Sequence, residues 1–311
     1  MDAVKRVLSG DVRALARAIS VVEENTQGSA ALLRGVFPHT GRATVIGVTG
    51  SPGAGKSSLV DRLVASFREQ GKRVGVVAVD PSSAYSGGAI LGDRVRMQGH
   101  AEDEGVFIRS MASRGHMGGL SRAASDAVDL LDAAGYDPVL IETVGVGQDE
   151  IEVARAADVV TVVLVPGMGD DIQAIKAGIL EIADIFVINK ADRPGADKVG
   201  AELEAMMGLA PLAAPRPPIY RTVATSGEGV PALRDGLVAY VSTAGATLRA
   251  KRRWERAEMR FLGVLTERFL RDVRERLLPG PRFAEVVSEI AERRIDPYTA
   301  ADRLLQRGGE R

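Results

Sequence analysis

The chain has 311 residues and a formal net charge of -1, so no excess of positive charge points to nucleic acid or to an anionic membrane surface. It contains no cysteine, which excludes disulfides and thiolate metal sites and suits a reducing compartment. No apolar run approaches the length of a membrane span, and the N-terminus lacks the apolar core of a signal peptide. We therefore expect a cytoplasmic protein that binds neither nucleic acid nor membrane, with one large α/β core and helical additions.

The residues before the first apolar run have a helical pattern. Asp11 is placed to cap a helix whose apolar side carries Leu15 and Ile19, and Ser29 is placed to begin another. This stretch contains no candidate catalytic residue, so we expect residues 1–40 to be an N-terminal helical extension with a packing role.

A glycine-rich stretch follows the first predicted strand, over residues 44–48, and leads into a helical pattern. It fits the phosphate-binding pattern G-x-x-x-x-G-K-[ST], in which glycines let backbone N–H groups turn toward a phosphate beside a helix N-terminus. Lys56 can reach the β- and γ-phosphates, and the Ser57 hydroxyl can bind Mg²⁺. We expect nucleotide contacts from Gly50, Ser51, Pro52, Gly53, Ala54, Gly55, Lys56, Ser57 and Ser58.

Six further apolar runs predict strands that alternate with amphipathic helices. They cover residues 73–80, 105–109, 138–142, 158–165, 184–189 and 218–222. Because these runs are rich in Val, Ile and Leu without alternation, they predict a mostly parallel sheet covered on both faces. The predicted fold class is therefore α/β of the P-loop NTPase type, with the nucleotide domain over residues 41–245.

Three carboxylates are candidates for Mg²⁺ and catalysis. Asp80 ends the second strand, beside the phosphate loop in a doubly wound sheet. Glu142 occupies the Walker-B position, where we expect it to act on Mg²⁺ through water or to position the attacking water, while the N–H of Gly145 senses the γ-phosphate. Asp93 either binds Mg²⁺ or caps a helix that begins at Arg94. The predicted metal ligands are Ser57, Asp80, Asp93 and Glu142, and the predicted catalytic residues are Lys56, Glu142 and Asp93.

The sequence Asn189-Lys190-Ala191-Asp192 directly follows an apolar strand and fits the N-K-x-D pattern of guanine-specific sites. A carboxylate at Asp192 can accept hydrogen bonds from the N1–H and the 2-amino group of guanine, a pair of donors that adenine lacks. The next strand leads into Val223, Ala224 and Thr225, whose N–H groups can close over the base. The same letters also fit a plain strand-to-helix turn capped by Ser226.

The C-terminal part changes character. From Thr247 to Leu277, apolar residues recur at three- and four-residue steps, which predicts one long amphipathic helix that ends at Pro279-Gly280. A shorter helix is predicted around residues 283–294. The long helix either packs back on the core or serves as a dimer-forming arm, and we favour a C-terminal helical dimerisation arm over residues 246–311.

Five stretches together resemble the MeaB/ArgK family of P-loop GTPases. They are Val-Thr-Gly-Ser-Pro-Gly-Ala-Gly-Lys-Ser at 48–57, Val-Asp-Pro-Ser-Ser at 79–83, Gly-Asp-Arg-Val-Arg-Met at 92–97, Glu-Thr-Val-Gly-Val-Gly-Gln at 142–148, and Asn-Lys-Ala-Asp at 189–192. Glutamate at 142 is what this family carries. At 223–225 the sequence has Val-Ala-Thr, where the family usually has a Ser-Ala pair.

The resemblance implies a SIMIBI-type P-loop sheet that binds GTP or GDP with Mg²⁺ and hydrolyses GTP slowly. It also implies a homodimer that acts as a chaperone of an adenosylcobalamin-dependent acyl-CoA mutase, most often methylmalonyl-CoA mutase, gating cofactor loading and protecting the mutase. No arginine can be assigned as an intrinsic finger, so we expect slow turnover that a partner accelerates.

Two other functions are weighed against this one. A metal-insertion GTPase of the nickel type needs clusters of Cys and His, whereas this chain has no Cys and three dispersed His. A P-loop kinase for a small metabolite would prefer ATP and would lack the N-K-x-D signature.

Overall fold

The computed structural model describes residues 2–24, 28–80, 98–100, 102–112, 122–143, 149–167, 182–208, 216–243 and 246–308. The chain divides into two compact units, Met1–Arg252 and Arg253–Arg311. Each unit is described below by itself.

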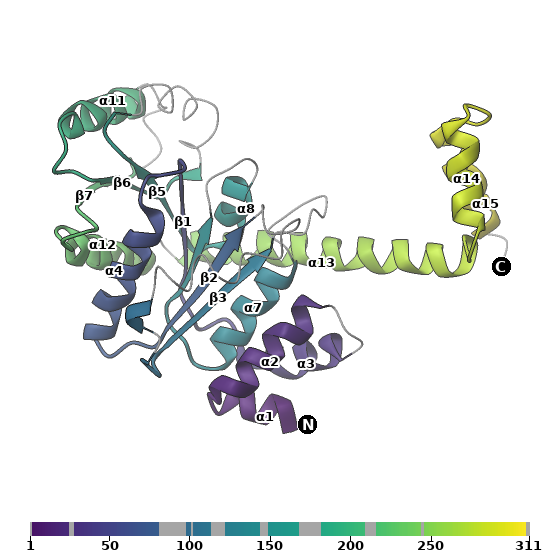
Figure 1. The fold of residues 1–311 in the computed structure, drawn as a ribbon, viewed down its shortest axis with the longest axis horizontal. Helices are drawn as coiled ribbons and strands as arrows, with labels where there is room; N and C mark the ends of the chain where they lie inside the picture. Colours follow the sequence, from purple (N-terminus) through teal and green to yellow (C-terminus); the bar gives the residue numbers. More distant parts are fainter. Residues whose placement is uncertain are drawn as a thin grey trace. The chain divides into compact units, whose positions relative to one another are not determined.

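The first unit is built on one sheet of seven parallel strands (Figure 1). The order across the sheet is β3-β2-β4-β1-β5-β6-β7. The strands are β1 (Val45–Gly50), β2 (Val74–Asp80), β3 (Val106–Ala112), β4 (Val139–Thr143), β5 (Val159–Leu164), β6 (Ile185–Asn189) and β7 (Ile219–Thr222). All seven predicted strands are confirmed, and so is the α/β P-loop fold class; the third strand runs beyond its predicted end at Arg109 to Ala112.

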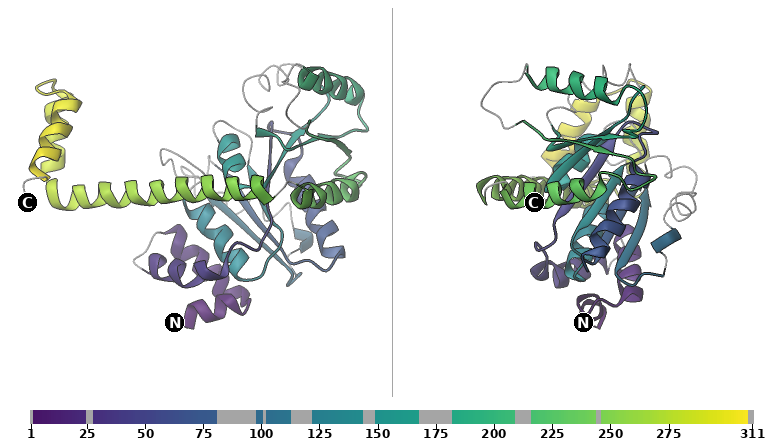
Figure 2. Two further views of the ribbon diagram at one scale, coloured as in Figure 1. Left: turned by 180° about the vertical axis from the view of Figure 1, so that it is seen from behind. Right: turned by 90° about the vertical axis from the view of Figure 1, so that its left-hand side faces the viewer.

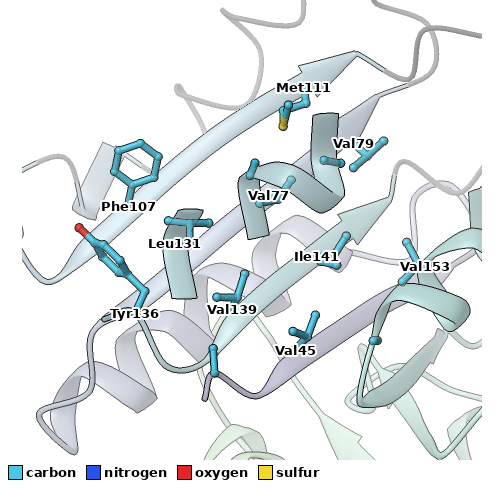
Figure 3. Packing of buried hydrophobic residues seen from close by; sticks show 14 of the residues in the cluster. Val45, Val77, Val79, Phe107, Met111, Leu131, Tyr136, Val139, Ile141 and Val153 are labelled. Atoms are coloured by element: carbon cyan, nitrogen blue, oxygen red, sulfur yellow. The ribbon is translucent and has the colours of Figure 1, made fainter. Parts of the chain in front are cut away.

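Helices cover both faces of the sheet, because the central strands are buried along their whole length. One face packs against α4 (Lys56–Glu69) and α12 (Val230–Thr243). The other face packs against α7 (Arg122–Ala133), α8 (Asp149–Ala156) and α11 (Ala196–Gly208). On that second face Leu131 of α7 belongs to the same buried cluster as Val77 and Val139 of the sheet (Figure 3).

Three short helices precede the sheet and extend its second face. They are α1 (Asp2–Leu8), α2 (Val12–Glu23) and α3 (Ser29–Val36), followed by the 3₁₀ turn η1 (Phe37–His39). Asp11 caps α2 by accepting a hydrogen bond from the N–H of Ala14 at 2.9 Å, as the sequence predicts. Leu15 and Ile19 are fully buried in the same core as α7, and these helices lie beside α7 in both views of Figure 2. A second 3₁₀ turn, η2 (Gln98–His100), precedes β3.

The second unit consists of helices. α13 (Ala246–Leu277) begins in the first unit and continues into the second, and it ends before Pro279-Gly280 as predicted. α14 (Arg282–Ala291) matches the predicted shorter helix, whereas α15 (Pro297–Gly308) is not anticipated by the sequence analysis. Within the described residues, no helix combines the length and apolar character needed to cross a lipid bilayer.

Candidate functional site

The predicted nucleotide residues follow strands whose carboxyl ends meet at one edge of the sheet, here called the site edge. From β1 the chain continues to β2, which lies toward the β3 end of the strand order. From β4 it continues to β5, which lies toward the β7 end, so the direction of the connections reverses near β1. Ligands bind in α/β sheets at such a reversal, outside the carboxyl ends of the strands. The phosphate loop connects β1 to α4 at this point (Figure 1).

Two glycines of the phosphate loop have backbone positions that other residues could not occupy. Gly50 has φ 135°, and a Cβ atom there would lie 2.2 Å from the carbonyl oxygen of Val163. Gly55 has φ 83°, and a Cβ there would lie 2.6 Å from the side-chain nitrogen of Asn189. The loop is therefore packed against two neighbouring strands, which fixes its path independently of any ligand.

Lys56 lies along the inside of this loop. Its ammonium donates hydrogen bonds to the carbonyl oxygens of Gly50 at 2.7 Å and Ser51 at 3.0 Å. The residue is only 5% exposed, so its charge is held next to the backbone N–H groups that the motif predicts for phosphate binding. Pro52, Gly53 and Ser58 are exposed around it.

Ser57 and Glu142 form an oxygen pair beside the loop. The Ser57 hydroxyl donates to the Glu142 carboxylate, with 2.5 Å between the two oxygens, and Glu142 is buried at the end of β4. A hydroxyl and a carboxylate are hard oxygen donors of the type Mg²⁺ prefers, so this pair fits the predicted ion. One residue further along β4, the hydroxyl of Thr143 donates to that of Thr49 at 3.2 Å.

The remaining predicted ligands are only partly described. Asp80 is the last residue of β2, at the site edge, and the structure describes its backbone alone. Asp93 and Gly145 lie outside the described residues. Their predicted roles in binding Mg²⁺ and sensing the γ-phosphate remain predictions.

Asn189, at the end of β6, joins the phosphate loop to the loop after β7. Its side-chain nitrogen donates to the carbonyl oxygen of Ala54 at 2.8 Å. Its side-chain oxygen accepts from the N–H of Ala224 at 3.1 Å and from the hydroxyl of Thr222 at 3.2 Å. Because Asn189 is 1% exposed, these buried hydrogen bonds fix the two loops relative to each other.

The other residues of the N-K-x-D motif follow in a tight turn. Lys190 has φ 55°, and its ammonium donates to the carbonyl oxygen of Gly53 at 2.8 Å, which adds a second link to the phosphate loop. Asp192 is exposed, and among the described contacts no hydrogen bond or ion pair engages its carboxylate. The motif thus leaves its acidic side chain available at the rim of the site.

The loop after β7 carries the remaining predicted contacts. Val223 and Thr225 flank the buried Ala224, and this segment precedes α12. The Ser226 hydroxyl donates to the carbonyl oxygen of Val223 at 3.2 Å, four residues before α12 begins. Ser226 therefore stabilises the turn itself, whichever role the segment has toward a base.

Sequence reasoning missed three side chains of this arrangement, Thr49, Thr222 and Arg62. Arg62 of α4 donates from Nε to the carbonyl oxygen of Ala224 at 3.1 Å and from Nη2 to that of Thr225 at 3.0 Å. No local signal identifies such residues, because their partners come from distant strands and loops. A correct strand order combined with the helical position of Arg62 would have been the only route to them.

Comparison with known proteins gives the family. The sequence model of a family described as "Methylmalonyl Co-A mutase-associated GTPase MeaB" matches residues 15–277. A Pyrococcus abyssi protein named as a GTPase is 45% identical over 312 residues, covering 98% of this chain and 95% of that protein. A Caenorhabditis elegans protein named "Methylmalonic aciduria type A homolog, mitochondrial" is 33% identical over 326 residues, covering 97% and 81%.

A solved structure supports the same assignment. The crystal structure of a protein titled "LAO/AO transport system kinase" superposes with a TM-score of 0.69 at 28% identity, covering 98% of this chain and 96% of that one. The chain therefore belongs to the MeaB family and is a GTPase.

Proposed function

We propose that the site edge binds GTP and GDP with Mg²⁺, with the phosphates in the loop of residues 50–57 and the guanine between Asp192 and the loop after β7. The observation that carries this proposal is the hydrogen bonding of Asn189 to both Ala54 and Ala224. These bonds join the two elements that must hold opposite ends of one nucleotide.

The phosphate end has a cation and an oxygen pair in place. Lys56 neutralises charge on the β- and γ-phosphates, and backbone N–H groups of the loop donate to the same oxygens. Ser57 and Glu142 would hold Mg²⁺, with Asp80 and Asp93 as further predicted ligands. When bound, Mg²⁺ supplies compensating positive charge to the phosphate oxygens during transfer. Glu142 also serves as the candidate for positioning the attacking water.

The base end divides recognition among three groups. The oxygen of Asn189 already accepts two hydrogen bonds and its nitrogen donates one, so one N–H remains for a ligand. Since guanine and adenine both present an N7 acceptor, that N–H contributes affinity for purines in general. In the segment 223–225, the N–H of Val223 donates to Glu228 and that of Ala224 donates to Asn189. Discrimination against adenine therefore rests on Asp192 and on the N–H of Thr225.

The nucleotide assignment is tested by calorimetry in the presence of Mg²⁺. We expect heat from GTP and GDP, and at least about 100-fold weaker binding of ADP, as a site with a dedicated carboxylate acceptor rejects the wrong base. The folded protein giving no heat with GDP would remove the proposal.

We further propose that this GTPase is a chaperone of an adenosylcobalamin-dependent acyl-CoA mutase, with methylmalonyl-CoA mutase as the foremost candidate, and that it gates cofactor loading and protects the mutase. Support comes from the description of its family and from the name of its C. elegans relative. The test is GTP turnover measured with and without a purified mutase of this class. We expect slow basal turnover and acceleration by the mutase; fast turnover that ignores the mutase would contradict the role.

A homodimer through α13 is part of the same proposal. In the second unit, large apolar side chains recur along this helix with high exposure, such as Trp254 and Phe261 at 65% each and Phe269 at 53%. A second copy covering them would remove apolar surface from water. Light scattering on a Phe261→Glu, Phe269→Glu variant should give a monomer mass, whereas an unchanged dimer mass would place the dimer contact elsewhere.

The metallochaperone alternative has less support. Among the described residues, no three His, Asp or Glu side chains are grouped as a metal-binding set. Nickel or zinc binding by the purified protein with an affinity comparable to that of GTP would favour this alternative.

A further inference from the structure

Arg62 links the phosphate-loop helix to a segment 162 residues further along the chain. Its guanidinium donates to the carbonyl oxygens of two successive residues, Ala224 at 3.1 Å and Thr225 at 3.0 Å. A planar guanidinium holds two acceptors at once and so fixes the orientation of the peptide units that carry them.

The same segment is held from its other side. The N–H of Ala224 donates to Asn189, while its carbonyl oxygen accepts from Arg62. Ala224 is buried, so the peptide units on both sides of it are held by hydrogen bonds to side chains of β6 and α4. Because α4 begins at Lys56 and Ser57, the helix that starts at the phosphates also orients this segment.

The N–H of Val223 donates to the carbonyl oxygen of Glu228 and that of Ala224 donates to Asn189. We propose that Arg62 is a positioning residue for base preference: by binding the carbonyl oxygen of Ala224, it orients the peptide unit that carries the N–H of Thr225 and aims that N–H at the O6 atom of guanine. This inference rests on the proposed role of that segment in contacting the base. Adenine carries an amino donor where guanine carries the O6 acceptor. A fixed N–H donor at this position therefore favours guanine and opposes adenine, and a donor that can turn away loses that discrimination.

The chain provides a matched control in Arg234 of α12. Its Nη1 donates to the carbonyl oxygen and the hydroxyl of Ser66, at 3.2 and 2.9 Å, on the same helix α4. Arg234 thus joins α4 to the part of the chain after β7, as Arg62 does, but without touching residues 223–225. A purely structural arginine link predicts the same result for both positions.

The test compares Arg62→Met, Arg62→Lys and Arg234→Met with the wild-type chain. Binding of GDP, inosine diphosphate and ADP is measured by calorimetry with Mg²⁺, together with the thermal midpoint. For Arg62→Met we expect the preference for GDP over ADP to fall about 10-fold, the factor for one net hydrogen bond. The preference for GDP over inosine diphosphate should not change, because these two differ only at the 2-amino group. Arg62→Lys keeps the charge and offers a single point donor, so its loss should be intermediate.

Arg234→Met should leave both preferences at the wild-type values. An unchanged GDP-to-ADP preference in Arg62→Met, equal weakening of GDP and ADP, or the same shift in Arg234→Met would each overturn the inference. These outcomes leave the proposed function standing, because wild-type binding of GDP is measured in the same series. A wild-type protein without preference for GDP would instead overturn the proposed function and this inference together.

Discussion

Aspartates lie at both the amino and the carboxyl ends of the strands, and their hydrogen bonding differs between the two. At the edge opposite the site, here called the amino edge, four of them accept backbone N–H groups near the starts of β1 and β5. The pairs are Asp132 with Ala43 at 3.0 Å, Asp137 with Thr44 at 3.0 Å, Asp158 with Val45 at 2.9 Å, and Asp184 with Val160 at 2.8 Å. At the site edge, Asp192 is exposed, and among the described contacts its carboxylate accepts no hydrogen bond.

The comparison separates stability from function. Asp184 is 6% exposed and also accepts from Tyr240 and from the guanidinium of Arg252, with Nη2 2.6 Å and Nη1 2.7 Å from its oxygens. Arg252 donates in addition to the carbonyl oxygen of Asp158 at 2.6 Å. The carboxylates at the amino edge thus have hydrogen-bond partners within the protein, so substitutions there should lower the free energy of unfolding. Substitutions at the site edge should instead change nucleotide binding or hydrolysis.

The largest effect should come from Lys56→Ala at the site edge. Removing the phosphate cation should lower GTP hydrolysis about 1,000-fold, because charge that develops on the phosphates loses its fixed partner. Phosphate release measures the activity, and circular dichroism measures unfolding. A melting temperature as low as that of an amino-edge variant would contradict the separation.

Asp184→Asn should give the largest loss of stability. It leaves Arg252 without its carboxylate, and breaking this largely buried ion pair from one side should cost about 3 kcal/mol of unfolding free energy. Chemical denaturation measures the change, and GTP turnover per folded molecule should stay at the wild-type value. The control is Asp197→Asn, whose partner Arg221 forms an exposed pair with it, for which we expect a change within about 0.5 kcal/mol.

Asn189→Ala should lower both stability and nucleotide affinity, because the Asn189 side chain supports the two loops and also lies in the proposed nucleotide site. The buried carbonyl oxygen of Ala54 and the N–H of Ala224 lose their partner, which should cost about 2 kcal/mol of unfolding free energy. GDP affinity should fall in the same variant. If denaturation and calorimetry showed only one of these two losses, Asn189 would belong to one role alone.

Asp192→Asn should change base preference and leave stability unchanged, with a smaller effect than the variants above. The amide replaces an acceptor for the 2-amino group of guanine, so the preference for GDP over inosine diphosphate should fall about 10-fold. Unfolding free energy should change by no more than about 0.5 kcal/mol, as at other exposed positions. Competition binding measures the preference, and an unchanged value would remove Asp192 from base recognition.

The smallest effect concerns pH at the amino edge. Burial, together with the hydrogen bond to Asp184, raises the pKa of Tyr240 from 10.0 to about 12. The folded state therefore keeps a phenol proton that the unfolded chain releases, so this contribution to stability is complete below pH 10 and is lost between pH 10 and about 12. Tyr240→Phe should remove a tyrosinate step near pH 12 from an ultraviolet titration, and Tyr298→Phe should leave that step in place.

Local patterns predicted the strands and the phosphate loop well, because buried parallel strands and the motif each have a short-range signature. The same holds for Asp11 as a cap and for the end of α13 before Pro279. The Arg62 contacts and the Asp184–Arg252 pair could not be predicted, since each depends on which distant strands and helices become neighbours. The domain boundaries, the dimer and the roles of all the predicted site residues, from the phosphate loop to Thr225, stay predictions.

The hydrogen bonds that Asn189 already makes have a consequence for protein engineering. A variant of this GTPase that binds and hydrolyses a synthetic nucleotide needs a changed base preference and an unchanged phosphate loop. Asn189 is the wrong position for that purpose, because its amide binds Ala54 and packs against Gly55. Redesign should begin at the exposed Asp192, where a substitution can change the hydrogen bonds offered to the base without removing a contact of the phosphate loop.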